Sequence, residues 1–191
     1  VYAALGRVWL DAAEERGDPS DLRKALEALE PVASQSTASS DTMGFYGRAL
    51  VLAGRYAEAE QAFQQASQRF PVDPGVLPHH ASVAQRLGHL DDARKALIRY
   101  SVLVDDDRDQ AARAAHIADL SLQLSDPMTA VVWYEKSESL GGVGASLLAR
   151  LADAQARAGQ LDKARATLQR AVEKGPKSRS ALAVARRLQA R

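Results

Sequence analysis

Apolar residues recur along this chain at the three- and four-residue intervals of an amphipathic helix, in stretches of about a dozen residues. Glycine, serine or proline interrupts the pattern between one stretch and the next. A short connection between two helices favours an antiparallel pair. The hydrophobic pattern therefore predicts an all-α chain built from helix pairs.

The helix pairs repeat along the chain with a nearly constant period. The reference position is an alanine soon after each turn: Ala25, Ala59, Ala93, Ala130 and Ala164, at spacings of 34, 34, 37 and 34 residues. A large apolar or aromatic residue follows four positions later: Leu29, Phe63, Leu97, Tyr134 and Leu168. A turn residue precedes the alanine by five positions: Ser20, Gly54, Gly88, Ser125 and Gly159. We expect the turn glycines to adopt the left-handed conformation that ends a helix, and the alanines to let two helices approach closely.

This arrangement resembles the tetratricopeptide repeat family, whose period is 34 residues of helix–turn–helix. The copy at 40–73 matches the family pattern most fully: Tyr46, Gly47, Leu50, Gly54, Tyr56, Ala59, Phe63, Ala66 and Pro71. Met43 stands where the family has a tryptophan. The resemblance implies a right-handed α-solenoid of antiparallel helix pairs, a single domain over 1–191 with repeats at about 3–37, 40–73, 74–110, 111–144 and 145–178.

The last segment, 179–191, predicts one more helix, which we expect to pack through Leu182, Ala185 and Leu188. Arg186 occupies the position that is small in the other first helices: Gly47, Ala81, Ala118 and Ala152. We interpret this segment as a polar-faced cap, such as solenoids need, with a truncated sixth repeat as the alternative. The start at Val1 is consistent with a chain cut from something longer.

Composition excludes several classes of function. Hydrophobic residues make up 46% of the chain, and 25 basic residues nearly balance 24 acidic ones. This balance argues against nucleic acid and anionic membranes as partners. The chain has no cysteine, which removes disulfides, thiolate metal sites and cysteine nucleophiles and leaves cytoplasm and periplasm both open. No apolar run reaches the roughly 18 residues of a membrane span.

Three motifs resemble metal-, calcium- or phosphate-binding sites, but none has the residues that such a site needs. His79 and His80 point about 100° apart on a helix, so they do not share a metal ion; His79 and His116 occupy the same position in consecutive repeats. "VDDDRDQ" (104–110) lacks the spaced ligands and glycine of a calcium loop, and Asp109 favours the following helix N-terminus. "SLGGVGASL" (139–147) fits neither phosphate-binding pattern and predicts a linker. We expect no catalytic residue, metal or cofactor, and no enzyme activity.

The resemblance implies a concave groove, lined by the first helices, that binds an extended peptide or a partner's helix. The inward positions are Phe45, Arg48, Leu52, His79, Ser82, Arg86, His116, Asp119, Gln123, Arg150, Asp153, Arg157 and Arg187. This surface is basic at both ends with Asp119 and Asp153 between, so we expect a ligand with acidic ends and a basic or polar middle. The asparagine that helps some relatives clamp a partner's C-terminus is absent.

We therefore expect a protein-interaction scaffold that binds a peptide or subunit. One alternative is an accessory domain of a larger bacterial enzyme or of an envelope, secretion or glycan-export assembly protein. Another is self-assembly, as a homo-oligomer, through apolar surface of the N-terminal repeat at Tyr2, Leu5 and Trp9.

Overall fold

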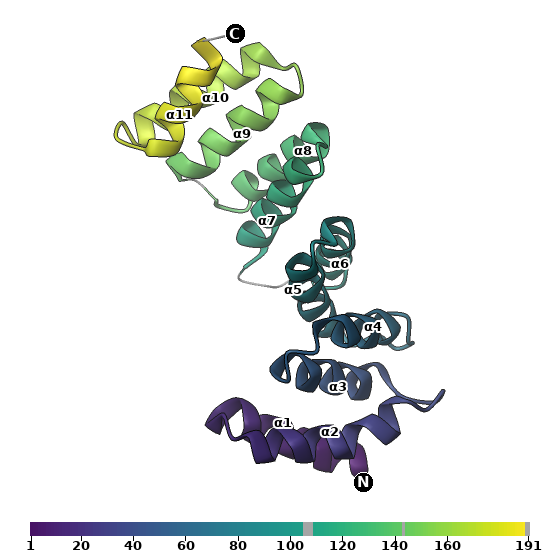
Figure 1. Cartoon of the computed structure of the whole chain (residues 1–191). Helices are drawn as coiled ribbons and strands as arrows, with labels where there is room; N and C mark the ends of the chain where they lie inside the picture. Colours follow the sequence, from purple (N-terminus) through teal and green to yellow (C-terminus); the bar gives the residue numbers. More distant parts are fainter. Residues whose placement is uncertain (105–108, 143, 190–191) are drawn as a thin grey trace. The chain divides into compact units, whose positions relative to one another are not determined.

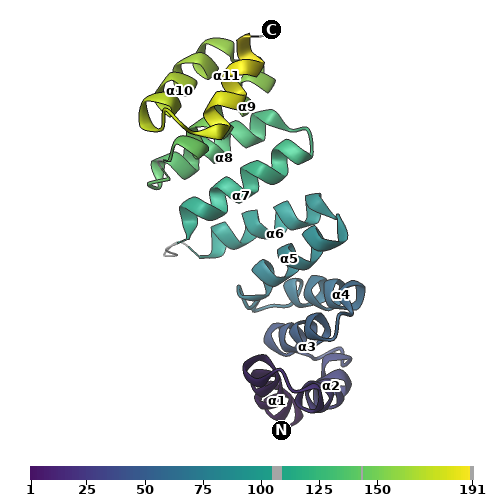
Figure 2. The ribbon, with the colours of Figure 1, turned by 60° about the vertical axis from the view of Figure 1, so that its left-hand side comes forward.

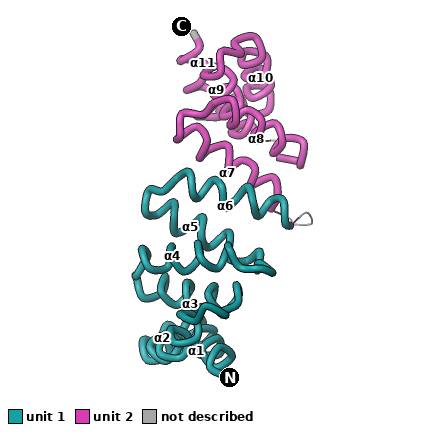
Figure 3. Tube along the Cα trace, turned by 90° about the vertical axis from the view of Figure 1, so that its right-hand side faces the viewer, with its two compact units in different colours: residues 1–103 teal, residues 104–191 magenta. Residues whose placement is uncertain are grey.

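The computed structural model describes residues 1–104, 109–142 and 144–189, and every regular element in these ranges is an α-helix (Figure 1). None of these helices is both long and apolar enough to cross a membrane. The helices form two compact units, Val1–Leu103 and Val104–Arg191 (Figure 3). The boundary falls at the start of the 104–110 connector, of which residues 105–108 lie outside the described ranges. The single domain over 1–191 stays a prediction.

The first unit holds three helix pairs: α1 (Tyr2–Arg16), α2 (Pro19–Ala33), α3 (Ser40–Leu52), α4 (Tyr56–Ser67), α5 (Val76–Leu87) and α6 (Leu90–Leu103). The two helices of each pair pack together, and α2 also packs on α3 and α4 on α5. The first helices are in contact as well, α1 with α3 and α3 with α5. Figure 2 shows the pairs in succession from α1 to α6. The first helices therefore form one side of this unit.

The second unit holds two pairs and a final helix: α7 (Gln110–Gln123), α8 (Pro127–Ser139), α9 (Ala145–Arg157), α10 (Leu161–Lys174) and α11 (Arg179–Gln189). The helices of each pair pack together, α8 packs on α9, and α11 packs on both α9 and α10. In both units the first helices of the predicted repeats begin within about two residues of the expected positions.

The three turn glycines adopt the expected left-handed conformation: Gly54, Gly88 and Gly159, with φ of 73°, 84° and 79°. Ser125 adopts it as well, with φ of 59°. The first pair differs, because Ser20 does not lie in the turn. The left-handed residue there is Gly17 (φ 69°), and Ser20 lies inside α2. Asp18 caps α2 by accepting the Ser20 N–H at 2.8 Å, and Pro19 at the first helical position has its φ already set for a helix. The helix therefore starts before Ser20.

The core consists of the repeated positions. All five reference alanines are fully buried, at 0% exposure. Leu29, Phe63 and Tyr134 are also fully buried, whereas Leu168 is partly buried. A Cβ atom built on Gly47 would lie 2.6 Å from the Phe63 ring, so the glycine is what lets α3 approach α4 this closely.

The packing face of α11 differs from the prediction by one residue. Ala181 and Val184 are buried and Leu188 is partly buried, whereas Leu182 is exposed. Both sets follow the three- and four-residue steps of a helix face, with steps of three and four for 181, 184 and 188 and of three and three for the predicted set, so the sequence pattern alone does not choose between them. Arg186 is exposed, as expected for a helix with a polar outer face.

Candidate functional site

The residues predicted to line a groove lie on first helices of the pairs, except Arg187, which lies on the final helix. Phe45, Arg48 and Leu52 lie on α3; His79, Ser82 and Arg86 on α5; His116, Asp119 and Gln123 on α7; Arg150, Asp153 and Arg157 on α9; and Arg187 on α11. The structure brings some of these side chains together within each unit.

In the first unit, Arg48 is held by α1. Its Nε and Nη2 atoms donate to the two carboxylate oxygens of Glu14 at 3.1 and 2.5 Å, in a bidentate ion pair. The Phe45 ring is contacted by two guanidinium groups, Arg7 at 5.4 Å and Arg48 at 5.9 Å from the ring centroid. These contacts place an aromatic ring among charges on the outer surface of α1 and α3.

His79 lies on the next first helix, α5. Its ring is stacked on the buried Phe63 ring, with centroids 5.8 Å apart and planes 13° from parallel. Partial burial lowers the pKa of His79, and the Arg48 guanidinium lowers it further, so the imidazole is neutral at pH 7. A cavity of about 100 Å³ between α3 and α5 is lined by Phe45, Arg48 and His79 together, along with Asp41, Gly44, Asp73, Gly75 and Val76. Three predicted residues therefore meet at one small hollow.

The remaining predicted residues of the first unit do not line this cavity. Leu52 and Ser82 are exposed. Arg86 lies over the Tyr56 ring, with its guanidinium carbon 4.2 Å from the centroid, and so contacts α4 rather than another first helix.

In the second unit, Asp119 is the centre of a three-residue contact. The buried Tyr134 hydroxyl donates to one of its carboxylate oxygens, and Arg150 Nη1 donates to the other at 2.6 Å. Burial is the main cause of a strongly raised pKa for Tyr134, and the bond to Asp119 adds to it. The phenol therefore stays protonated and donates at any ordinary pH.

A second carboxylate, Asp153, accepts two arginines. Arg157 Nη2 lies 2.9 Å and Arg187 Nη1 lies 3.0 Å from its oxygens, and the Asp153 side chain is only 15% exposed. The charges that the sequence presents as basic ends and an acidic middle are thus paired within each unit. Gln123 is exposed and His116 is partly buried.

Sequence reasoning missed the partner of Arg48. Glu14 stands 34 residues before Arg48, so the repeat period applied to α1 identifies the same column as Arg48, Ser82, Asp119, Asp153 and Arg187. The repeat period therefore carried a signal for Glu14, although the predicted groove began only at the second repeat.

Among the residues that the structure describes, no group of three or more histidine, aspartate or glutamate side chains lies close enough to hold an ion. His79 belongs to the first unit and His116 to the second. The glycine-rich segment at 139–147 connects α8 to α9, with Gly141 in the left-handed conformation at φ 96°.

Two family models described as tetratricopeptide repeat match residues 18–78 and 145–189, together more than half of the chain. Among solved structures, "YrrB: a TPR protein with an unusual peptide-binding site" superposes with a TM-score of 0.69 at 16% identity, over 93% of this chain and 90% of that one. A crystal structure of MamA superposes with a TM-score of 0.65 at 17% identity, over 91% of this chain and 93% of that one. MamA from Desulfovibrio magneticus RS-1 superposes with a TM-score of 0.64 at 16% identity, over 93% of this chain and 97% of that one. A search of curated proteins found no match. At these identities the likenesses concern the fold, and they confirm the predicted all-α solenoid of helix pairs.

Proposed function

The chain belongs to the tetratricopeptide repeat family and is a protein–protein interaction module, and we propose that it binds an extended peptide or a partner's helix on the first-helix side of its units. Domains of this family are typically non-catalytic scaffolds, and we infer the same role here. YrrB is described as having a peptide-binding site, which makes the same type of ligand reasonable for this fold.

The observation that carries the proposal is the hollow between α3 and α5. Phe45, Arg48 and His79 come from two different helices and converge on it. It combines apolar ring surface, a cation, the carboxylates of Asp41 and Asp73, and a neutral imidazole that can donate or accept a hydrogen bond. Such a mixture suits a peptide, which presents apolar side chains together with backbone donors and acceptors.

The ion pairs on this side do not prevent ligand binding. The Glu14 and Arg48 side chains are both partly exposed, at 36% and 26%. A carboxylate of the ligand can therefore compete with Glu14 for Arg48. Arg187 is 55% exposed and shares Asp153 with Arg157, so it can also contact a ligand carboxylate. Acidic groups of a ligand thus remain favoured at both arginines.

A pull-down with matched variants tests this proposal. The wild-type chain is immobilised and exposed to native lysate, and captured proteins are identified by mass spectrometry. Phe45→Ala and Arg48→Glu should each remove the same captured protein. The control is Arg165→Glu, which makes the same charge reversal on an exposed second-helix site of α10. Circular dichroism checks that all variants keep their helix content.

The outcomes are distinct. Loss of one protein in both α3 variants, with retention in the control, supports the first-helix side as the binding surface. Retention in both α3 variants, with helix content unchanged, contradicts it.

Exposed apolar side chains on α1 favour self-assembly as a second candidate. Tyr2, Leu5 and Val8 are exposed, Val8 at 62%, whereas Trp9 is partly buried with the Lys24 ammonium 4.0 Å from its ring centroid. Sedimentation of wild type and of Val8→Asp over a concentration series tests this candidate, and a monomer at every concentration excludes it. The accessory-domain hypothesis stays a prediction that the full-length gene tests.

A further inference from the structure

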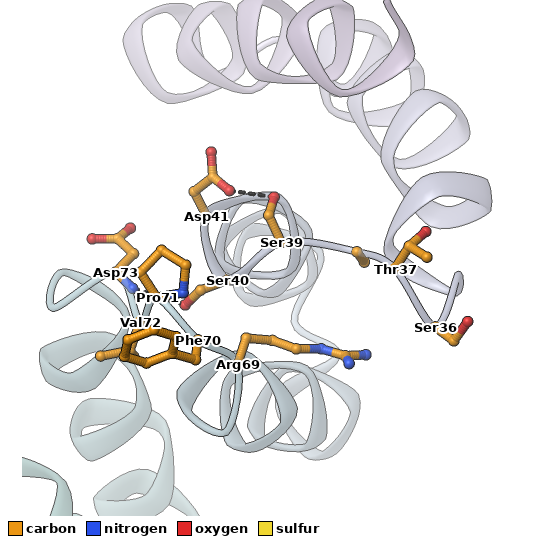
Figure 4. Close-up of a pocket in the computed structure, with 11 residues that line it drawn as sticks. Ser36, Thr37, Ser39, Ser40, Asp41, Arg69, Phe70, Pro71, Val72 and Asp73 are labelled. Carbon is orange, nitrogen blue, oxygen red and sulfur yellow. Dashed lines mark hydrogen bonds between the residues drawn. The ribbon is translucent and has the colours of Figure 1, made fainter.

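A larger cleft, between two connections, adjoins the hollow between α3 and α5 and shares Asp41 and Asp73 with it. Its volume is about 490 Å³, and residues 36–41 and 69–73 line it. The first segment joins α2 to α3 and the second joins α4 to α5, so the cleft lies where the second helices end (Figure 4). Its volume is within the roughly 300–1,000 Å³ typical of ligand pockets. Residues 36–40 and 69–72 line this cleft and not the hollow that carries the proposed function.

The two walls of the cleft are tied together by a buried serine. Ser40 is 2% exposed; its hydroxyl donates to the Ala66 carbonyl at 2.9 Å and accepts the Asp73 backbone N–H at 3.0 Å. It thus joins the start of α3 to the end of α4 and to the α4–α5 connection. A site held this way is formed before a ligand arrives, which lowers the entropic cost of binding.

The cleft has charges of opposite sign at its two ends. Figure 4 shows the carboxylates of Asp41 and Asp73 at one end and the Arg69 guanidinium extending toward the other. Within the part of the chain that the structure describes, neither carboxylate has a cationic partner. Asp41 accepts the Ser39 hydroxyl, and Asp73 accepts the Gly75 N–H at 2.9 Å, which leaves oxygen lone pairs open to a ligand.

An aromatic residue stands at the edge of the cleft. Phe70 is 99% exposed, although an aromatic side chain of this kind can bury roughly 150–250 Å² in an interface. The neighbouring Val72 makes no backbone hydrogen bond within the described residues, so its N–H and C=O remain open to another extended chain. The cleft therefore offers an apolar contact, open backbone groups and negative charge within one short segment.

We propose that this cleft binds an extended peptide segment of a partner protein, with a lysine or arginine side chain placed between Asp41 and Asp73. The Phe70 ring packs on an apolar side chain of the segment, and the open Val72 backbone groups bond its main chain. A basic side chain is the occupant because it supplies the charge and the donors that the two carboxylates lack.

An NMR titration of the whole 191-residue chain tests the proposal. The probe is a capped pentapeptide, Ser-Leu-Arg-Leu-Ser, compared with the same peptide carrying citrulline, an uncharged isostere of arginine. We expect amide shifts to concentrate at residues 36–41 and 69–73. The citrulline peptide should bind at least about tenfold more weakly, because hydrogen bonds to charged groups are lost.

Asparagine variants remove the negative charge of the two carboxylates and keep the size of the side chains. Asp41→Asn and Asp73→Asn keep the amide oxygen that accepts the Ser39 hydroxyl or the Gly75 N–H, so the cleft keeps its shape. Each should weaken arginine-peptide binding by about tenfold, and Phe70→Ala should weaken both peptides. The control is Asp162→Asn, the same change on the exposed surface of α10, which should leave binding unchanged.

Three results overturn the proposal: no shifts with millimolar arginine peptide, equal binding of the two peptides, or shifts that cluster at Phe45 and His79 instead. The last result supports the first-helix surface and rejects the cleft. Because Asp41 and Asp73 line both sites, the failures of the two proposals are distinguished by shifts at residues 36–40 and 69–72 against shifts at Phe45 and His79, and by the Phe70→Ala variant.

Discussion

Gly47 is the position where packing and helix propensity make opposite predictions. It lies inside α3, where alanine is favoured over glycine by about 1 kcal/mol. Propensity alone therefore predicts that Gly47→Ala stabilises the first unit. The tertiary structure predicts the reverse, because a Cβ atom there would lie 2.6, 2.8 and 2.9 Å from three atoms of the Phe63 ring.

The magnitude follows from those distances. Carbon atoms in contact lie about 3.5–4.0 Å apart, so the ring would have to move by about 1 Å. Phe63 is fully buried and stacked on His79, so it has little room to move. Overpacking costs about 1–3 kcal/mol, and three simultaneous overlaps put this site in the upper half of that range. After the gain in propensity, we expect a net loss of about 1–2 kcal/mol.

Urea denaturation followed by tryptophan fluorescence measures the effect. Trp9 lies in the first unit and Trp133 in the second, so a Trp133→Phe background leaves a reporter for the unit that contains Gly47. Ala166→Gly, at an exposed site in the middle of α10, measures the effect of helix propensity alone. Its unfolding, followed by circular dichroism, should show a loss of about 1 kcal/mol in the free energy of unfolding.

Gly47→Ala at or above wild-type stability would refute the close approach of α3 and α4. A second test uses Phe63→Leu, which makes room for the new methyl group. The double variant should be more stable than the sum of the single effects predicts, by at least about 0.5 kcal/mol. Simple additivity would show that the methyl group does not meet the ring.

Three further predictions concern buried positions. Ala59→Leu and Ala164→Leu add bulk at fully buried sites and should each cost about 1–3 kcal/mol; unchanged urea midpoints would argue against close helix contact there. Asp119→Ala removes the acceptor of the buried Tyr134 hydroxyl and should cost about 1–3 kcal/mol, with Tyr134→Phe recovering part of it in a double-mutant cycle. Burial lowers the pKa of His80 in the folded chain below its ordinary 6.5. Between the folded-state pKa and 6.5, the unfolded chain therefore binds more protons than the folded chain. Stability should therefore fall as the pH drops through that window, and less so in His80→Gln; equal pH slopes of the urea midpoint in the two proteins would contradict this.

The helical framework was predictable because its determinants are local and periodic. The reference alanines, the large residues four positions later and most of the turn residues took the predicted roles. The first turn failed at Ser20 because Asp18 and Pro19 start α2 early, a capping signal that the repeat alignment did not consider.

The candidate sites were only partly predictable, for a different reason. Period and spacing identify which residues share a helix face, and Phe45, Arg48 and His79 do meet. Period and spacing do not identify which charges pair across helices, and so the Glu14–Arg48 and Asp153–Arg187 pairs were missed. The Asp153–Arg157 pair lies within α9 at i,i+4 spacing, which the sequence does show.

By itself, the sequence determined the helices, their turns and the small residues of their contacts, because these depend on spacing along one chain. Only the tertiary structure decided which arginines are paired, that Phe70 is exposed, and that Asp41 and Asp73 lie at one end of a cleft. Those features depend on distances of a few ångströms between segments about 30 residues apart, which the pattern of apolar positions leaves open.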